Sequence, residues 1–194
     1  MKVSIIGGAT GSGKTTLVLD LARYLNKQGE KIGVIVQETG EVDYDEKTLT
    51  DLGIKTKEVN SVCIPCSLDT DIRSNLLMLK DEFSPDIIFI ETEETVIPNK
   101  LKIDLERMQL PDAELLPAIV LVNSEESETQ SDQLPEYARK QFQGAEIVCI
   151  NMTERDTEEH IAGIKSMLAE LNPDAKILVS PHVRDQSFLK ALVS

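Results

Sequence analysis

Short apolar runs recur along the chain and give the first indication of its fold. The runs are rich in Val and Ile and nearly continuous, without the polar alternation of a half-exposed strand. This pattern predicts β-strands that are covered on both faces. The runs occupy residues 3–6, 32–36, 87–90, 119–122, 147–150 and 177–179.

Between several of these runs, leucines and isoleucines repeat at the spacing of one helix face. The stripes consist of Leu17, Leu21 and Leu25, of Leu68, Ile72, Leu76 and Leu79, and of Ile161, Ile164, Leu168 and Leu171. Strands that alternate with helices predict an α/β fold, a three-layer sandwich with a mostly parallel central sheet. In such folds the loops at the carboxyl ends of the strands carry function, so sites are expected there.

A glycine-rich loop follows the first apolar run and leads into the first helical stripe. It reads Gly8-Ala9-Thr10-Gly11-Ser12-Gly13-Lys14-Thr15, with Thr16 next. In this GxxxxGK[ST] pattern the glycines let backbone N–H groups turn toward phosphate oxygens, and the following helix adds its positive end. Lys14 is expected to contact the β- and γ-phosphates of a nucleotide, and Thr15 a Mg²⁺ ion. The nucleotide-binding candidates of the loop are Gly8, Gly11, Ser12, Gly13, Lys14, Thr15 and Thr16.

Acidic residues follow the second and third apolar runs. Glu38 lies in the polar segment 37–45, and Glu91 opens the segment Glu91-Thr92-Glu93-Glu94. Either carboxylate can complete the shell of a Mg²⁺ ion, and an acid at the position of Glu91 can orient an attacking water. Lys14, Glu38 and Glu91 are therefore the candidate catalytic residues. The alternative for both glutamates is a solvated surface acid in an acidic chain.

Two cysteines form a CxxC pair, Cys63-Ile64-Pro65-Cys66, just before the second helical stripe. Two thiolates can bind Zn²⁺, Ni²⁺ or Co²⁺, but a closed tetrahedral site needs two further ligands. A second subunit of a homodimer can supply its own pair, or Glu38 and water can complete the shell. A redox dithiol and two unrelated packed cysteines remain alternatives.

The other cysteine and the two histidines, residue types that often bind metals, are not expected to be metal ligands. Cys149 lies inside an apolar run and is predicted to be core. His160 lies in a helical segment, where it is expected to be solvated or bonded locally. His182, in Ser180-Pro181-His182, follows the last strand and can border a base pocket together with Ser180.

Composition limits the possible partners and compartments. A chain of 194 residues that is 41% hydrophobic can form one core, and no linker-like segment divides it, so we expect a single domain over residues 1–194. The formal net charge of −14 argues against a nucleic-acid partner. No apolar run is long enough for a signal peptide or a membrane span, so the sequence predicts a cytoplasmic protein with reduced thiols.

Taken in order, the motifs resemble those of the metal-centre-assembly GTPases that include the CobW, HypB and UreG proteins, and the CobW type most closely. That group carries GxxGSGKTTL, NEFGEVGxD, GCxCC-SL, ETSGLxxP, NKxD and NPxA. The corresponding segments here are Gly8 to Leu17, Gln37 to Asp45, Cys63 to Leu68, Glu91 to Pro98, Asn151 to Glu154, and Asn172 to Ala175. The resemblance covers nearly the whole chain. We expect this chain to have no counterpart of the second domain of larger CobW proteins.

The resemblance implies GTP and Mg²⁺ as ligands, with Asn151 and Glu154 at the base. In that family the asparagine contacts the base edge and an aspartate accepts two hydrogen bonds from guanine. Here Met152 replaces the lysine of the motif and Glu154 its aspartate. Met152 can keep the apolar cover of the base, and Glu154 can still accept a hydrogen bond. Guanine is therefore favoured, with adenine or no strong base preference as the alternatives.

Two other departures bear on activity. Pro65 replaces the middle cysteine of the metal motif, which leaves a two-thiolate site of undetermined stoichiometry. Glu94 replaces a glycine whose N–H in the family follows the γ-phosphate, so hydrolysis is expected to be slow or altered.

These features support three functional hypotheses. The first is a nucleotide-dependent metallochaperone for a metalloenzyme or corrinoid protein, in which the nucleotide state acts through the Glu38 segment on Cys63 and Cys66. The second is a degenerate nucleotide-binding accessory protein that hardly hydrolyses nucleotide. The third is a small-molecule P-loop kinase, for which the sequence shows no Arg-rich lid.

Overall fold

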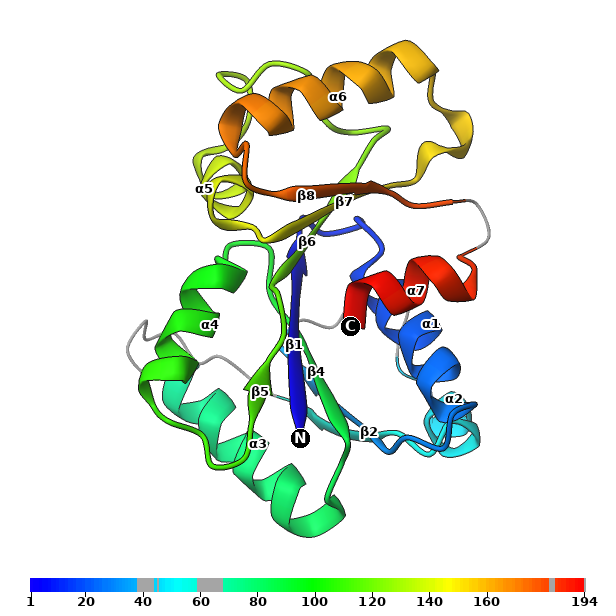
Figure 1. The fold of residues 1–194 in the computed structure, drawn as a ribbon, viewed down its shortest axis with the longest axis vertical. Helices are drawn as coiled ribbons and strands as arrows, with labels where there is room; N and C mark the ends of the chain where they lie inside the picture. Colours follow the sequence, from blue (N-terminus) through cyan, green and yellow to red (C-terminus); the bar gives the residue numbers. More distant parts are fainter. Residues whose placement is uncertain (38–43, 45, 59–67, 182–183, 194) are drawn as a thin grey trace.

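Parallel strands form one sheet in the computed structural model, which describes residues 1–37, 44, 46–58, 68–181 and 184–193. Figure 1 shows the sheet with helices on both of its faces. The strands are β1 (Lys2–Gly8), β2 (Ile32–Val36), β3 (Lys55–Glu58), β4 (Ile87–Glu91), β5 (Glu114–Leu115), β6 (Ile119–Asn123), β7 (Ile147–Asn151) and β8 (Lys176–Val179). The helices are α1 (Lys14–Asn26), α2 (Glu46–Asp51), α3 (Leu68–Phe83), α4 (Pro98–Arg107), α5 (Glu136–Gly144), α6 (Glu158–Leu171) and α7 (Gln186–Val193), with a 3-10 turn η1 (Thr153–Arg155).

The strand order is β3-β2-β4-β1-β6-β7-β8, and β5 pairs with the beginning of β1. Every pairing is parallel. In the register Glu91 lies opposite Ile6 of β1 and Val36 of β2. The glycine-rich loop after β1 and the acidic segment after β4 therefore leave the sheet side by side.

Alternating side chains of each strand enter cores on opposite faces of the sheet, which explains why the strands are apolar throughout. Ile6 and Phe89 pack with α1 and α7, whereas Ile5 and Ile90 pack with α3 and α4. Val120 of β6 joins a third cluster with α5 and α6. The α1 and α7 side and the α3 and α4 side are visible on the right and left of Figure 1.

The predicted three-layer α/β sandwich is confirmed, and each predicted apolar run lies within a strand. The three helical stripes lie in α1, α3 and α6. The sequence analysis did not predict β3, β5, α2, α4, α5 or α7.

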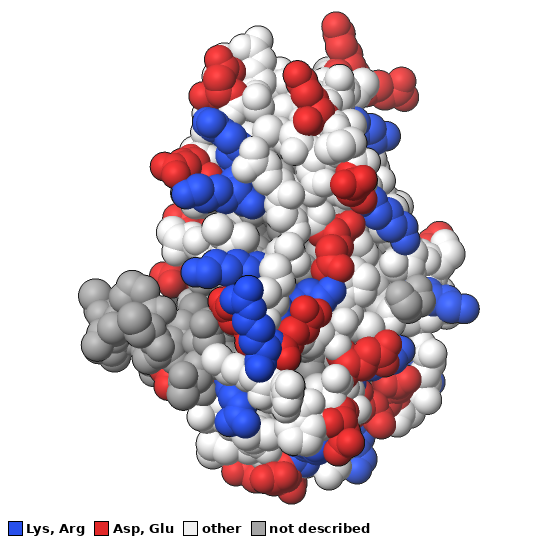
Figure 2. Space-filling model, turned by 60° about the vertical axis from the view of Figure 1, so that its left-hand side comes forward, with Lys and Arg blue, Asp and Glu red and all other residues white. Residues whose placement is uncertain are grey.

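Lys and Arg side chains do not form a continuous stripe on the face shown in Figure 2. They are interspersed with Asp and Glu side chains there. Several pairs are in contact, such as Lys80 with Asp112 and Lys102 with Glu146. None of the described helices combines the length and the apolar character needed to cross a membrane.

Candidate functional site

The glycine-rich loop (residues 8–15) joins β1 to α1, and its glycines are required by its shape. Gly8 and Gly13 have φ values of +135° and +91°, a backbone region that disfavours other residues. A Cβ on Gly8 would lie 2.4 Å from the Leu121 carbonyl oxygen, and one on Gly13 would lie 2.5 Å from Asn151 Nδ2. The loop therefore approaches the ends of β6 and β7 more closely than a side chain would allow.

Lys14, the first residue of α1, is buried and folds back over the loop. Its Nζ donates to the carbonyl oxygens of Gly8 and Ala9, each at 3.1 Å. The hydrogen-bond ladder of α1 begins with the Leu17 N–H, which donates to the Gly13 carbonyl. Amides in the first turn of a helix have no acceptor within it, and the helix dipole makes that end positive. A cation and a helix N-terminus thus meet at the loop, an arrangement suited to an anion.

The Ser12 hydroxyl is a second feature of the loop. It is fully buried and has no hydrogen-bond partner among the residues that the structure describes. A buried hydroxyl without a partner is costly, and a ligand or water in the loop can satisfy it. Thr16, by contrast, is exposed in the first turn of α1.

Glu91, at the carboxyl end of β4, is 1% exposed and accepts a hydrogen bond at each carboxylate oxygen. Thr15 Oγ1 donates to Oε1 at 2.5 Å, and the Tyr44 hydroxyl donates to Oε2 at 2.6 Å. Burial, together with the charge of Glu91, raises the pKa of Tyr44 far above its ordinary value, so the phenol remains a donor. The structure thus brings Thr15 and Glu91 together, as the sequence predicts, and adds Tyr44.

The donor set around Thr15 and Glu91 is made of oxygen atoms. A hydroxyl and a carboxylate are the hard ligands that Mg²⁺ takes alongside waters and phosphate oxygens. Thr15 follows Lys14 at the start of α1, and its bond to Glu91 brings the carboxylate to the same helix end. The residues therefore fit a magnesium ion bound together with a phosphate.

Glu94 contacts the glycine-rich loop directly. Its Oε2 accepts a hydrogen bond from the Thr10 backbone N–H at 3.3 Å. Its own carbonyl oxygen accepts from Gln141 Nε2 at 2.8 Å, which anchors the segment on α5. An acidic side chain thus lies against a loop whose other features favour anions.

On the other side of the loop, the end of β7 is held by Asn151. Its Nδ2 donates to the Ser12 carbonyl oxygen at 2.9 Å, and its Oδ1 accepts from Arg184 Nη2 at 2.9 Å. Arg184 also donates to Asp20 Oδ2 at 2.6 Å and from Nε to Ser180 Oγ at 3.1 Å. Arg184 was not a sequence candidate, and the only signal is that a cation follows Ser180 closely in an acidic chain.

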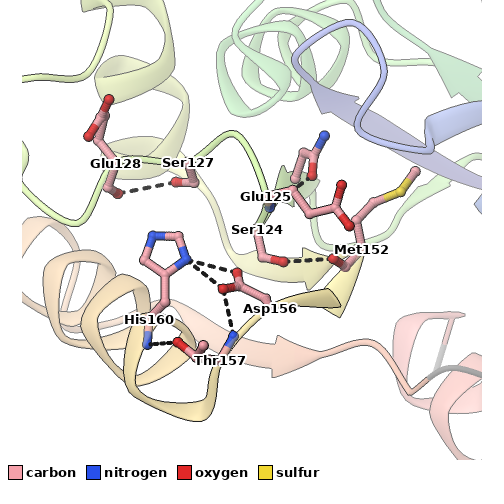
Figure 3. Close-up of polar contacts among 9 residues, drawn as sticks. Ser124, Glu125, Ser127, Glu128, Met152, Asp156, Thr157 and His160 are labelled. Atoms are coloured by element: carbon pink, nitrogen blue, oxygen red, sulfur yellow. Dashed lines mark hydrogen bonds and ion pairs between the residues drawn. The ribbon is translucent and has the colours of Figure 1, made fainter. Parts of the chain in front are cut away.

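The segment that follows Asn151 is held in place by side chains of the β6 loop and α6, as Figure 3 shows. Met152 has a φ of +61°, and its carbonyl oxygen accepts from Ser124 Oγ at 2.9 Å. Asp156 contacts the His160 ring at 2.8 Å, so this histidine is bonded locally, as predicted. Thr157 caps α6 by accepting from the His160 N–H. Glu154, the second base candidate, is exposed in this segment.

The same contacts shift the ionisation of Asp156. Partial burial by itself would raise its pKa, but hydrogen bonds from His160 and from the Thr157 N–H lower it and outweigh that effect. The pKa of Asp156 is therefore held below its ordinary value.

Several candidates lie outside the described residues, namely Glu38, Cys63, Cys66 and His182. Among the residues that are described, no group of three or more His, Cys, Asp or Glu side chains could hold a metal ion.

Cys149 is buried in the core, as predicted, and burial raises the pKa of its thiol to about 12.

A family model decides what kind of domain this is. The model of the CobW/HypB/UreG nucleotide-binding domain matches residues 2–179. The chain belongs to this family. The resemblance of its motifs to the CobW, HypB and UreG proteins is thereby confirmed, and with it the P-loop character of the fold.

A curated relative shows how much of the chain is shared. The zinc chaperone YeiR of Escherichia coli is 27% identical over 183 residues, which cover 93% of this chain and 55% of that protein. The chain thus spans about half the length of this curated relative.

Two solved structures share the fold of this chain. HypB from Archaeoglobus fulgidus superposes with a TM-score of 0.71 and 23% identity, covering 99% of this chain and 88% of that one. Zn(II)-bound YjiA GTPase from E. coli gives a TM-score of 0.69 and 24% identity, covering 97% of this chain and 60% of that one.

Proposed function

We propose that this CobW/HypB/UreG-family chain binds and hydrolyses GTP with Mg²⁺ and couples the nucleotide state to the handling of a transition metal. The observation that carries the nucleotide part is the hydrogen bond from Thr15 to Glu91 beside the buried Lys14. It places a hydroxyl, a carboxylate and an ammonium group at the positive end of α1. This combination suits a magnesium-bound triphosphate.

In this proposal each residue has a defined task. Bound Mg²⁺ supplies charge that neutralises the phosphates. Lys14 leaves the carbonyls of Gly8 and Ala9 and donates to the β- and γ-phosphates, while the loop amides bind phosphate oxygens. Thr15 and Glu91 hold the ion, and Glu91 or Glu38 orients the attacking water.

The metal part of the proposal rests on family membership and on the CxxC pair. Cys63 and Cys66, with Glu38 or a second subunit, would bind Zn²⁺, Ni²⁺ or Co²⁺ for delivery to a client metalloenzyme or corrinoid protein in the cytoplasm. The zinc-chaperone name of YeiR and the Zn(II) bound by YjiA support this choice of cargo. Coupling is reciprocal, so metal must change nucleotide affinity by the factor by which nucleotide changes metal affinity.

The test is a calorimetric titration of GTP and Mg²⁺ in the absence and presence of Zn²⁺, Ni²⁺ or Co²⁺. We expect a Zn²⁺-dependent change of GTP affinity that disappears in the Cys63→Ala/Cys66→Ala variant. Lys14→Ala should lose nucleotide binding and still bind metal. Identical GTP affinities with and without every metal would refute the coupling, and absence of GTP binding would refute the nucleotide site.

A second candidate function, a nucleotide-binding accessory protein with little hydrolysis, is favoured by one contact. The Glu94 carboxylate accepts a hydrogen bond from the Thr10 amide, and its negative charge lies against the loop proposed for the γ-phosphate. Single-turnover GTP hydrolysis by wild type and Glu94→Gly distinguishes the two. Turnover of wild type no faster than Lys14→Ala, with a gain in Glu94→Gly, would support the accessory role.

A further inference from the structure

Arg184 joins three parts of the chain that surround the glycine-rich loop: α1 through Asp20, the end of β7 through Asn151, and the end of β8 through Ser180. We infer that Arg184 is a positioning residue that fixes the Asn151 carboxamide so that it presents an N–H donor to N7 of a purine base. This inference rests on the proposed nucleotide site and adds a recognition element to it.

The contacts of Asn151 define the orientation of its amide. A guanidinium group can only donate, so the atom that faces Arg184 Nη2 must be the carboxamide oxygen. A carbonyl oxygen can only accept, so the atom that faces Ser12 must be the amide nitrogen. The two contacts, each at 2.9 Å, hold the amide at both ends and fix its plane.

A count of donors shows what the amide can still offer. The Nδ2 group carries two protons, and the Ser12 carbonyl oxygen takes one of them. The Asn151 oxygen already accepts from Arg184. The second Nδ2 proton is therefore the donor that Asn151 can present to a ligand. Purines have an acceptor at N7 and pyrimidines have no counterpart, so this donor selects purines without separating guanine from adenine.

Arg184 is itself held firmly enough to act in this way. Its side chain is 11% exposed and donates to Asp20 Oδ2 at 2.6 Å, a charge-assisted bond that joins it to α1. Its Nε bond to Ser180 Oγ fixes the other edge of the guanidinium plane. Lysine could not replace it, because one ammonium group cannot reach three acceptors in a planar arrangement.

Arg23 provides a matched control within the same cluster. It also pairs with Asp20, at 3.1 Å, but its side chain is 49% exposed and it makes no contact with Asn151 among those described. Removal of either arginine deprives Asp20 of one ion pair, whereas only the removal of Arg184 releases the Asn151 amide.

The experiment compares the affinities of GTP and 7-deaza-GTP, which lacks the N7 acceptor, in wild type, Arg184→Met and Arg23→Met. We expect wild type and Arg23→Met to bind GTP about five-fold more tightly than 7-deaza-GTP, the value of one neutral hydrogen bond. In Arg184→Met this ratio should fall to about one. The ratio is taken within one variant, so a smaller folded fraction cancels.

The outcomes separate the inference from the proposed function. If wild type binds neither nucleotide, the proposed nucleotide site is wrong. If wild type binds both equally, or if Arg184→Met keeps the wild-type ratio, nucleotide binding stands and the role of Arg184 is refuted. Should Arg184→Met fail to fold, the same ratio in Arg184→Lys decides: a preserved ratio refutes the inference, and a reduced ratio supports it.

Discussion

At the scale of single residues, Gly13 is a position where the glycine-rich loop tolerates little change. Its φ of +91° strains any other residue, and a Cβ would lie 2.5 Å from Asn151 Nδ2. Gly11 has a φ of +76° but would place its Cβ in open space. Gly13→Ala should therefore lower the free energy of unfolding by about 1–2 kcal/mol more than Gly11→Ala.

Urea denaturation of the two variants measures this difference. Both carry the backbone strain of a positive φ, so their comparison isolates the clash with Asn151. Equal urea midpoints for the two variants would contradict this expectation, because they would mean that Asn151 moves aside without loss of stability.

Cys149 is the second residue with a defined expectation. Its buried thiol has a pKa of about 12, and a protonated thiol is a poor nucleophile. The Cys63→Ala/Cys66→Ala variant should therefore not react with a thiol reagent at pH 8 until it is unfolded. Labelling with iodoacetamide followed by mass spectrometry, with and without urea, measures this, and rapid labelling of the native variant would contradict the burial of Cys149.

The candidate residues that the structure describes differ in how well sequence alone could identify them. Lys14 and Thr15 close the glycine-rich pattern that follows the first apolar run, and Glu91 comes directly after the third. Parallel strands bring their carboxyl ends to one edge of the sheet. Tyr44 and Arg184 reach the same edge from segments with no periodic pattern, so only tertiary packing reveals their contacts. Sequence therefore identified the residues expected to contact phosphate and missed those that orient them.

At the scale of elements, the start of α6 should make stability depend on pH. The contacts of Asp156 hold its pKa below its ordinary value, so its stabilising effect is complete above about pH 4 and is lost as pH falls through the lower folded value. Asp156→Asn should therefore unfold at a lower temperature than wild type at pH 7. The difference should shrink as the pH falls below about 4.

Thr157→Ala serves as the control at the same helix end. It removes the cap that accepts the His160 N–H and should cost about 1 kcal/mol. A hydroxyl does not titrate in this range, so that cost should not vary with pH. Thermal unfolding followed by circular dichroism from pH 3 to 7 compares the two, and a pH-independent effect of Asp156→Asn would contradict the shifted pKa.

Strands were predictable from sequence where both of their faces are buried, because such strands consist of a continuous apolar run. The edge strand β3 reads Lys-Thr-Lys-Glu and pairs only with β2, so it carries no apolar signal. The two residues of β5 are too few for any pattern. Helices α4 and α5 bury few side chains each, such as Leu101 and Phe142, and their stripes are correspondingly faint.

At the scale of the whole molecule, nucleotide should stabilise the fold, because the loop it is proposed to bind connects β1 to α1 in the middle of the sheet. A ligand that binds only the folded state at 100 times its Kd adds about 2.7 kcal/mol. For a chain of this size we expect a rise of about 5–10 °C in the unfolding temperature with Mg²⁺ and GTP. Calorimetric scans with and without GTP measure it.

Lys14→Ala provides the control for this effect. Without the ammonium group the same GTP concentration should leave the unfolding temperature unchanged. An equal rise in the variant would mean that GTP stabilises the protein at some place other than the glycine-rich loop.

The bond between Tyr44 and Glu91 has a spectroscopic consequence. The chain has no tryptophan and three tyrosines, so its ultraviolet fluorescence comes from phenols alone. A phenol that donates to a carboxylate at 2.6 Å emits weakly, because the excited state passes its proton toward the acceptor. Any rearrangement that moves Glu91 away from Tyr44 should increase the intensity of tyrosine fluorescence. The centre of the site thus has an intrinsic optical reporter that needs no attached dye.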